Sequence, residues 1–169
     1  DVGTVKVTVL IETINAVFQM EEFLWELKDH IVGLNAGRWD YLFSYQKVYR
    51  NTKKVILPDR SKVNMFVPFM SNYNKLLVDT CHKRGAFGMG GMSAQVIAKS
   101  NPAEVNEKAL AGVKKDKERE LNQGNDGAWV AHPSLVEPVK NIFEKNFDGP
   151  NQMKKFNNDK INRRDLLDE

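Results

Sequence analysis

The chain has 169 residues, of which 41% are hydrophobic and 28% are charged, and its formal net charge is +3. This balance is typical of a globular domain, and the scattered lysines and arginines do not indicate a nucleic-acid or membrane surface. A single cysteine, Cys81, excludes a disulfide framework, and no apolar run approaches the roughly 20 residues of a membrane-spanning helix.

The first third of the chain alternates between strand-like and helix-like patterns. Residues 5–11 are mostly β-branched and apolar, which predicts a strand covered on both faces. Apolar residues at helical spacing then predict a helix over 17–30, with Asn15 as a candidate N-cap. Residues 31–35 predict a second short strand that closes at Gly37.

The same alternation continues beyond a polar stretch around Pro58. Pro102 is suited to the first turn of a helix, and Gly85 is suited to a helix end. The predicted elements are a helix over 66–83, a strand over 86–89, a helix over 102–120, a strand over 127–131 and a helix over 133–143.

Four strand–helix repeats are typical of a parallel α/β sheet. They amount to about half of an eight-unit barrel, which typically needs ~250 residues. A small, open, doubly wound sheet fits the pattern nearly as well, and periodicity does not choose between the two. Residues 1–149 are expected to form this domain, and the polar segment 150–169 is interpreted as a linker or the start of another element.

Two acidic residues follow neighbouring predicted strands. Glu12 comes after the first strand, and Asp40 comes shortly after the second. Because neighbouring parallel strands lie roughly 4.8 Å apart and end at the same rim, these carboxylates can converge on one cation. Two carboxylates with waters and substrate oxygens suit Mg²⁺, although both residues could equally be polar positions that begin loops.

The glycines around Asp40 favour a binding site for a small anion. Gly33 and Gly37 permit close approach of the backbone, and the N–H groups of residues 38–40 could hold a carboxylate. A metal beside such a nest suits a 2-oxo acid, because the metal polarises the carbonyl while the nest holds the carboxylate.

The sixteen residues 28–43, Lys-Asp-His-Ile-Val-Gly-Leu-Asn-Ala-Gly-Arg-Trp-Asp-Tyr-Leu-Phe, resemble the signature of the malate synthase family. The likeness covers roughly residues 4–147. Its other segments are 9–13, 57–60, 80–87, 89–92 and 126–133.

This resemblance implies a (β/α)₈ TIM barrel of which the chain supplies about four βα units. It implies an acyltransferase that condenses acetyl-CoA with glyoxylate and water to give malate and CoA in the glyoxylate cycle, in a glyoxysome, a peroxisome or the cytoplasm. The implied site is Mg²⁺ on Glu12 and Asp40, glyoxylate on Gly37, Arg38, Trp39 and Asp40, and acetyl-CoA near His132 and Pro133.

The family's catalytic aspartate and its arginine match no position of this sequence. The isolated chain is therefore expected to be inactive and to need the remainder of a longer polypeptide. A related Mg²⁺-dependent acyl-CoA lyase and a non-catalytic domain remain alternatives. His30 and His82 are expected to be structural, and the glycine-rich run 88–92 is expected to be a tight turn from strand to loop.

Overall fold

The structure is a computed structural model that describes all residues except 53–55, 94, 96, 99, 168 and 169. Its strands are β1 (Val7–Ile11), β2 (Ile31–Ala36), β3 (Phe87–Ser93) and β4 (Gly127–Val130). Its α-helices are α1 (Ile14–Val17), α2 (Met20–Glu26), α3 (Arg38–Tyr49), α4 (Pro68–Lys83), α5 (Ala103–Gln123), α6 (Val136–Glu144) and α7 (Arg163–Leu167). Short 3₁₀ turns lie at η1 (Arg60–Lys62) and η2 (Pro133–Leu135).

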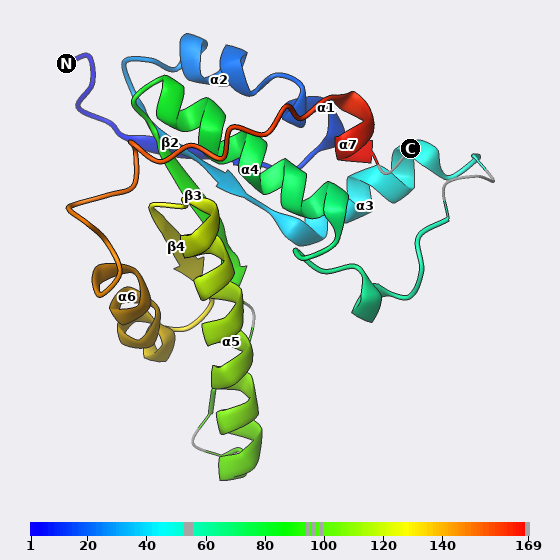
Figure 1. Cartoon of the computed structure of the whole chain (residues 1–169), viewed down its shortest axis with the longest axis vertical. Helices are drawn as coiled ribbons and strands as arrows, with labels where there is room; N and C mark the ends of the chain where they lie inside the picture. The colour runs from blue at the N-terminus through cyan, green and yellow to red at the C-terminus, as the bar shows by residue number, and fades with distance from the viewer. Residues whose placement is uncertain (53–55, 94, 96, 99, 168–169) are drawn as a thin grey trace.

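The four strands form one parallel sheet in the order β1-β2-β3-β4 (Figure 1). A doubly wound sheet reverses its strand order at a switch point, whereas strands of a barrel follow one another around it. Since this order has no reversal in the described residues, the arrangement is that of a barrel segment. The predicted parallel α/β architecture is confirmed, and the doubly wound alternative is wrong.

Strand β1 is buried on one face only. Val7, Val9 and Ile11 point toward the helices, whereas Thr8 and Leu10 on the other face are exposed. The expectation of a strand covered on both faces is wrong for this chain, because in a barrel the second face would point into the interior. Leu10 instead borders an open pocket.

The helix expected over 17–30 is broken into α1 and α2. Its N-cap is Thr13, whose hydroxyl accepts a hydrogen bond from the N–H of Ala16, and the prediction of Asn15 as the cap was wrong. The break lies at Phe18 and Gln19, between two short amphipathic segments that both bury apolar side chains. The helix expected over 66–83 begins at Pro68.

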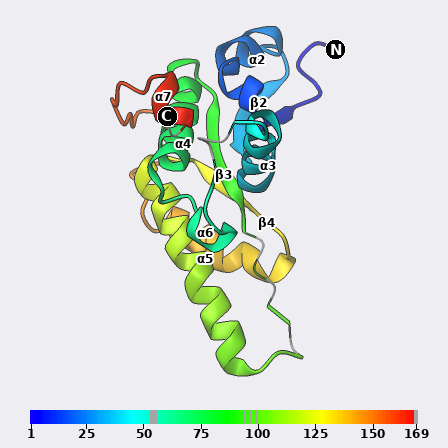
Figure 2. The ribbon, with the colours of Figure 1, turned by 90° about the vertical axis from the view of Figure 1, so that its right-hand side faces the viewer.

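Two regions departed from the sequence pattern. Helix α3 was not predicted, although it begins at Arg38 directly after β2. The glycine-rich run 88–92 is part of β3 and continues the strand to Ser93, so the prediction of a turn there was wrong. Helix α5 is longer than expected and projects beyond the sheet in both views (Figures 1 and 2).

The main core lies between β1, β2 and helices α1 to α4, and a smaller one lies between β4, α5 and α6. The segment after Gly149 runs back along α4 and ends in α7, where Leu166 and Leu167 join the main core (Figure 1). The hydroxyls of Tyr41 and Tyr45 donate to the carbonyls of these two leucines. No helix among the described residues is long and apolar enough to span a membrane.

Candidate functional site

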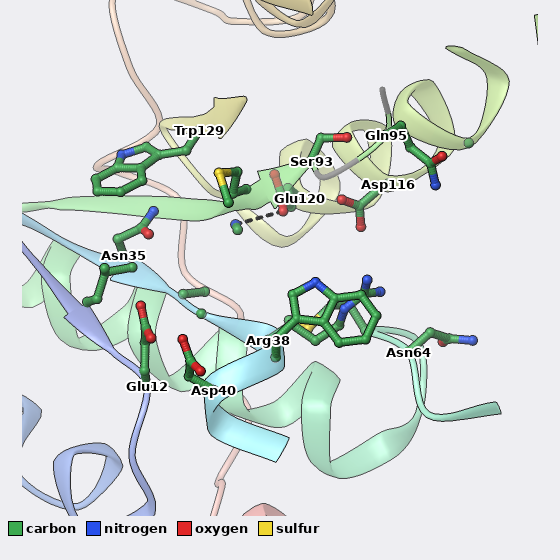
Figure 3. A pocket seen from close by; sticks show the side chains of 18 of the residues that line it. Glu12, Asn35, Arg38, Asp40, Asn64, Ser93, Gln95, Asp116, Glu120 and Trp129 are labelled. Carbon is green, nitrogen blue, oxygen red and sulfur yellow. Dashed lines mark hydrogen bonds between the residues drawn. The ribbon is translucent and has the colours of Figure 1, made fainter. Parts of the chain in front are cut away.

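A pocket of about 480 Å³ lies at the carboxyl ends of the strands. Glu12, Gly37 and Asp40 border it on the side of β1 and β2, and Gly91 and Glu120 border it on the side of β3 and α5 (Figure 3). In barrels of parallel strands this end carries the ligand-binding groups. The described residues therefore include a pocket at the end where chemistry is expected.

The carboxyl groups of Glu12 and Asp40 lie beside each other in the pocket (Figure 3). Burial of Glu12, its hydrogen bond with Asp40 and the negative charge of Asp40 raise the pKa of Glu12 to about 7. Two carboxylates in close contact repel each other unless a proton or a cation lies between them. This pair is therefore suited to a divalent cation.

Gly37 allows the two acids to approach. A Cβ atom at Gly37 would lie 2.3 Å from Cγ of Glu12, so any larger residue would displace that side chain. Tyr73 holds the backbone at Gly37 in place. Its hydroxyl accepts a hydrogen bond from the N–H of Gly37 at 3.0 Å and donates to the carbonyl of Ile11. The buried ring of Tyr73 stacks on Tyr41, with centroids 4.5 Å apart. The hydroxyl of Tyr73 thus binds the backbone of Ile11, just before Glu12, and of Gly37, shortly before Asp40.

Helix α3 begins beside this pair. Its first-turn N–H groups, at Arg38, Trp39 and Asp40, have no carbonyl partner within the helix, and the N-cap Gly37 has no side chain to accept from them. Such N–H groups and the positive end of the helix dipole attract anions. The guanidinium of Arg38 lies over the ring of Trp39, 4.3 Å from its centroid.

Asn35 supplies an unpaired buried acceptor in the same pocket. Its side chain is 1% exposed, and its Nδ2 donates to the carbonyl of Gly90 at 2.7 Å. Its Oδ1 is buried and has no hydrogen-bond partner in the described structure. An unpaired buried acceptor is unfavourable by about 1–3 kcal/mol, so this atom suits a ligand or a metal-bound water that donates to it.

The opposite wall contains a compensated charge cluster. Nζ of Lys117 lies 2.9 and 3.1 Å from the two carboxylate oxygens of Glu120, and both side chains are at most 1% exposed. Asp116 and Arg119 extend the cluster. This cluster was not predicted from the sequence, because alternating charges on a helix ordinarily indicate a solvated face.

The histidines have structural contacts in the described chain. His132 is exposed and caps η2 through Nδ1, and neither it nor Pro133 borders the pocket, although Trp129 of the preceding strand β4 does. Nδ1 of His30 donates to the carbonyl of Val5. His82 is buried between Asp126 and the carbonyl of Lys155.

The sequence and the fold agree with one family. The model of the malate synthase TIM-barrel domain matches residues 1–169. The chain belongs to the malate synthase family. The resemblance of residues 28–43 to the malate synthase signature is thereby confirmed. That signature spans the approach to β2, the whole strand and the first half of α3, which is the part of the fold that brings Asp40 to Glu12.

Curated malate synthases resemble the chain over most of its length. The glyoxysomal enzyme of Candida tropicalis is 54% identical over 151 residues, which is 89% of this chain and 27% of that protein. Malate synthase A of Escherichia coli is 54% identical over 141 residues, 83% of this chain and 26% of that protein. The malate synthase of Myxococcus xanthus is 47% identical over 98% of this chain and 30% of its own length. The chain thus spans between a quarter and a third of these malate synthases.

A solved citrate lyase from Burkholderia xenovorans has the same fold. It superposes with a TM-score of 0.61 over 82% of this chain and 38% of its own length, at 19% identity. At this identity the likeness concerns the fold alone. It agrees with the malate synthase barrel assignment.

Proposed function

We propose that this chain is the metal- and glyoxylate-binding part of a malate synthase, which joins acetyl-CoA to glyoxylate and releases malate and CoA. The observation that carries the proposal is the Glu12–Asp40 carboxyl pair beside the N-terminus of α3. An acidic pair suits a cation, and an adjacent helix N-terminus suits a carboxylate. Together they match a small 2-oxo acid that chelates a metal.

In this proposal Glu12 and Asp40 hold Mg²⁺. Burial of Glu12 and its contact with Asp40, which together raise its pKa, and the unpaired Oδ1 of Asn35 both support a hydrated divalent cation at this place. When bound, the cation supplies Lewis-acid polarisation of the glyoxylate carbonyl. Glu12 and Asp40 would hold it, and the unpaired Oδ1 of Asn35 would be available to accept a hydrogen bond from a group bound beside it.

The glyoxylate carboxylate is proposed to lie on the first turn of α3. The N–H groups of residues 38–40 would donate to it, and Gly37 leaves room for its approach. The side chain of Arg38 is engaged on Trp39, so we assign its backbone rather than its guanidinium to this contact. Acetyl-CoA would enter from the side of β4, where Trp129 borders the pocket near His132 and Pro133.

Turnover is proposed for the complete polypeptide. The strand order leaves β1 and β4 at the two edges of the described sheet, where further βα units of a barrel would pair. The aspartate that removes the acetyl proton and the arginine that stabilises the enolate would come from those units. We propose a glyoxysomal, peroxisomal or cytoplasmic location, because several of the curated relatives, among them that of Candida tropicalis, are named glyoxysomal.

The test measures thiol release from acetyl-CoA and glyoxylate by the full-length protein, with Mg²⁺ binding followed by calorimetry. Glu12→Gln and Asp40→Asn should each lower activity by at least about 100-fold and weaken Mg²⁺ binding. The matched control is Glu26→Gln, which changes an exposed carboxylate on α2 and should leave both unchanged.

Unchanged Mg²⁺ affinity in both site variants would refute the metal assignment. A wild-type protein that cleaves malyl-CoA but does not form malate would be a lyase instead. A full-length protein with neither activity would support a non-catalytic domain.

A further inference from the structure

We infer that Lys117 and Glu120 of α5 are positioning residues, which hold a β-bulge of β3 in place and thereby shape the wall of the pocket opposite Glu12 and Asp40. The inference rests on the proposed function, because it concerns catalysis in that pocket. It is carried by the contacts of one residue, Gly91, whose backbone N–H and C=O are both bound by this ion pair.

The register of β3 and β4 shows the bulge. Gly90 pairs with Ala128, and the next pair joins Ser93 to Val130. Two residues of β3, Gly91 and Met92, therefore lie opposite the single residue Trp129. A bulge interrupts the hydrogen bonds of the ladder and redirects the side chains that follow it. Gly91, Met92, Ser93 and Trp129 all border the pocket.

Side chains replace the interrupted ladder. Oε1 of Glu120 accepts from the N–H of Gly91 at 2.9 Å (Figure 3), and Nζ of Lys117 donates to the carbonyl of Gly91 at 2.6 Å. The preceding carbonyl, of Gly90, accepts from Asn35 at 2.7 Å. The N–H and C=O of Gly91 and the C=O of Gly90 thus each bind a side chain from α5 or β2.

The Lys117–Glu120 ion pair is fully buried against the glycines of the bulge. The side chain of Lys117 is 0% exposed and that of Glu120 is 1% exposed. A Cβ atom at Gly90 would lie 2.1 Å from Oε2 of Glu120, so the carboxylate occupies the space that the glycine leaves. Charged groups are seldom buried so completely without a specific partner. Besides each other, Lys117 and Glu120 share one partner, the backbone of Gly91.

The position of the bulge has a consequence for the proposed reaction. Gly91 lies between the charge cluster and β2, since a Cβ atom there would be 3.3 Å from the carbonyl of Ala36. Movement of Gly91 would therefore change the width of the pocket across from the acidic pair. Displacements of about 1 Å at a reaction site can lower rates by about 100-fold.

The experiment compares two charge-neutral double variants in the full-length protein. Lys117→Met with Glu120→Gln keeps an acceptor for the N–H of Gly91, whereas Lys117→Met with Glu120→Leu removes it. Both variants lack the buried charges, so neither leaves one ion unpaired. They differ in the acceptor at position 120, which the N–H of Gly91 shares with Arg119, and Arg119 keeps its ion pair with Asp116 in both. The first variant is therefore the control for the second.

We expect the Glu120→Leu double variant to lose kcat/KM by about 10- to 100-fold, while its Mg²⁺ affinity and its melting temperature stay close to those of the Glu120→Gln double variant. Equal kcat/KM in the two double variants would overturn the inference. An inactive wild-type protein would instead refute the proposed function, and hydrogen exchange would still test the bulge.

That exchange measurement needs no variant. The amide of Gly91 borders a pocket and lies in a bulge, so without its bond to Glu120 it would exchange as fast as an open amide. Slow exchange of Gly91 in the wild-type protein, comparable with that of the paired strand residues, supports the inference. Fast exchange overturns it, whether or not the double variants fold.

Discussion

Glu12 and Glu120 face the same pocket from opposite walls, and the pKa of each is raised to about 7. The causes differ. For Glu12 burial acts together with the like charge of Asp40. For Glu120 burial is the largest cause and the charge of Asp116 adds to it, while Lys117 and Arg119 oppose the shift. Similar pKa values therefore arise in two different settings: Glu12 has no cationic partner among the described residues, whereas Glu120 has two, Lys117 and Arg119.

This difference separates a binding group from a supporting one. Within the described part of the chain, neither Glu12 nor Asp40 forms an ion pair with a lysine, arginine or histidine. An exchangeable ion can satisfy such a pair. The carboxylate of Glu120 already has two cations, Lys117 and Arg119, and the N–H of Gly91 as partners, so it does not need an exchangeable ion.

The largest effect that tests this contrast is expected for Glu120→Ala. It leaves Lys117 buried without its main counter-ion, so we expect the free energy of unfolding to fall by about 3–5 kcal/mol. Glu118→Ala is the control on the same helix, because Glu118 pairs with Lys114 at 3.7 Å in an exposed ion pair and should contribute below about 1 kcal/mol. Urea denaturation measures both. Equal losses would contradict a compensated buried cluster.

The second prediction is that the Glu12–Asp40 pair makes the free energy of unfolding depend on Mg²⁺. Mg²⁺ at about 100 times its dissociation constant should raise the free energy of unfolding of the wild-type protein by about 2.7 kcal/mol. Glu12→Gln should abolish this gain without lowering stability in the absence of metal, since it removes a repulsion from Asp40. Thermal denaturation with and without Mg²⁺ gives the comparison. A Glu12→Gln protein that is still stabilised by Mg²⁺ would contradict the assignment.

The acidic pair was accessible to sequence reasoning, whereas the cluster around Glu120 was not. Glu12 and Asp40 follow runs of apolar residues whose pattern predicts parallel strands, and the ends of parallel strands meet at one rim. Lys117 and Glu120 lie on a helix of mixed charge, and only their contact with Gly91 distinguishes them from solvated residues. That contact joins residues 26 and 29 positions apart.

Helix α3 illustrates a second limit. It buries Tyr41, Leu42 and Tyr45 but leaves the apolar residues Phe43 and Val48 exposed, so apolar residues occur on both faces and no clear stripe results. The orphan Oδ1 of Asn35 was also beyond sequence reasoning, because whether an amide is paired depends on the surrounding fold.

Tyr73→Phe tests whether the hydroxyl of Tyr73 holds the backbone next to Glu12 and Asp40 in place. It removes the partner of the Gly37 N–H and the Ile11 carbonyl, so we expect a loss of about 1–3 kcal/mol and weaker Mg²⁺ binding. Tyr41→Phe is the matched control, because its hydroxyl bonds to Leu166 away from the pocket. It should lower stability and leave Mg²⁺ affinity unchanged. Equal effects on Mg²⁺ affinity would show that Tyr73 acts through the core only.

The smallest effect is expected for His82, which does not border the pocket of Glu12, Asp40 and Glu120. Burial opposes its protonation, but hydrogen bonds to Asp126 and to the carbonyl of Lys155 outweigh burial and raise its pKa. Both partners are acceptors, so both ring nitrogens must carry protons.

Because the pKa of His82 is higher in the folded protein, its contribution is fully present below its unfolded value of about 6.5 and is lost as the pH rises through the folded value. Urea denaturation from pH 6 upward should therefore show a decline in stability that His82→Gln removes and that replacement of the exposed His132 by Gln retains. Unchanged pH dependence in His82→Gln would mean that the ring is neutral in the folded protein. In that case one of its two acceptors would face a bare nitrogen. The segment after Gly149 would still be held to α4 by the bonds of Asn157 to Asp79, the Lys75–Asp159 ion pair and the bond from Asn72 to the carbonyl of Asp165.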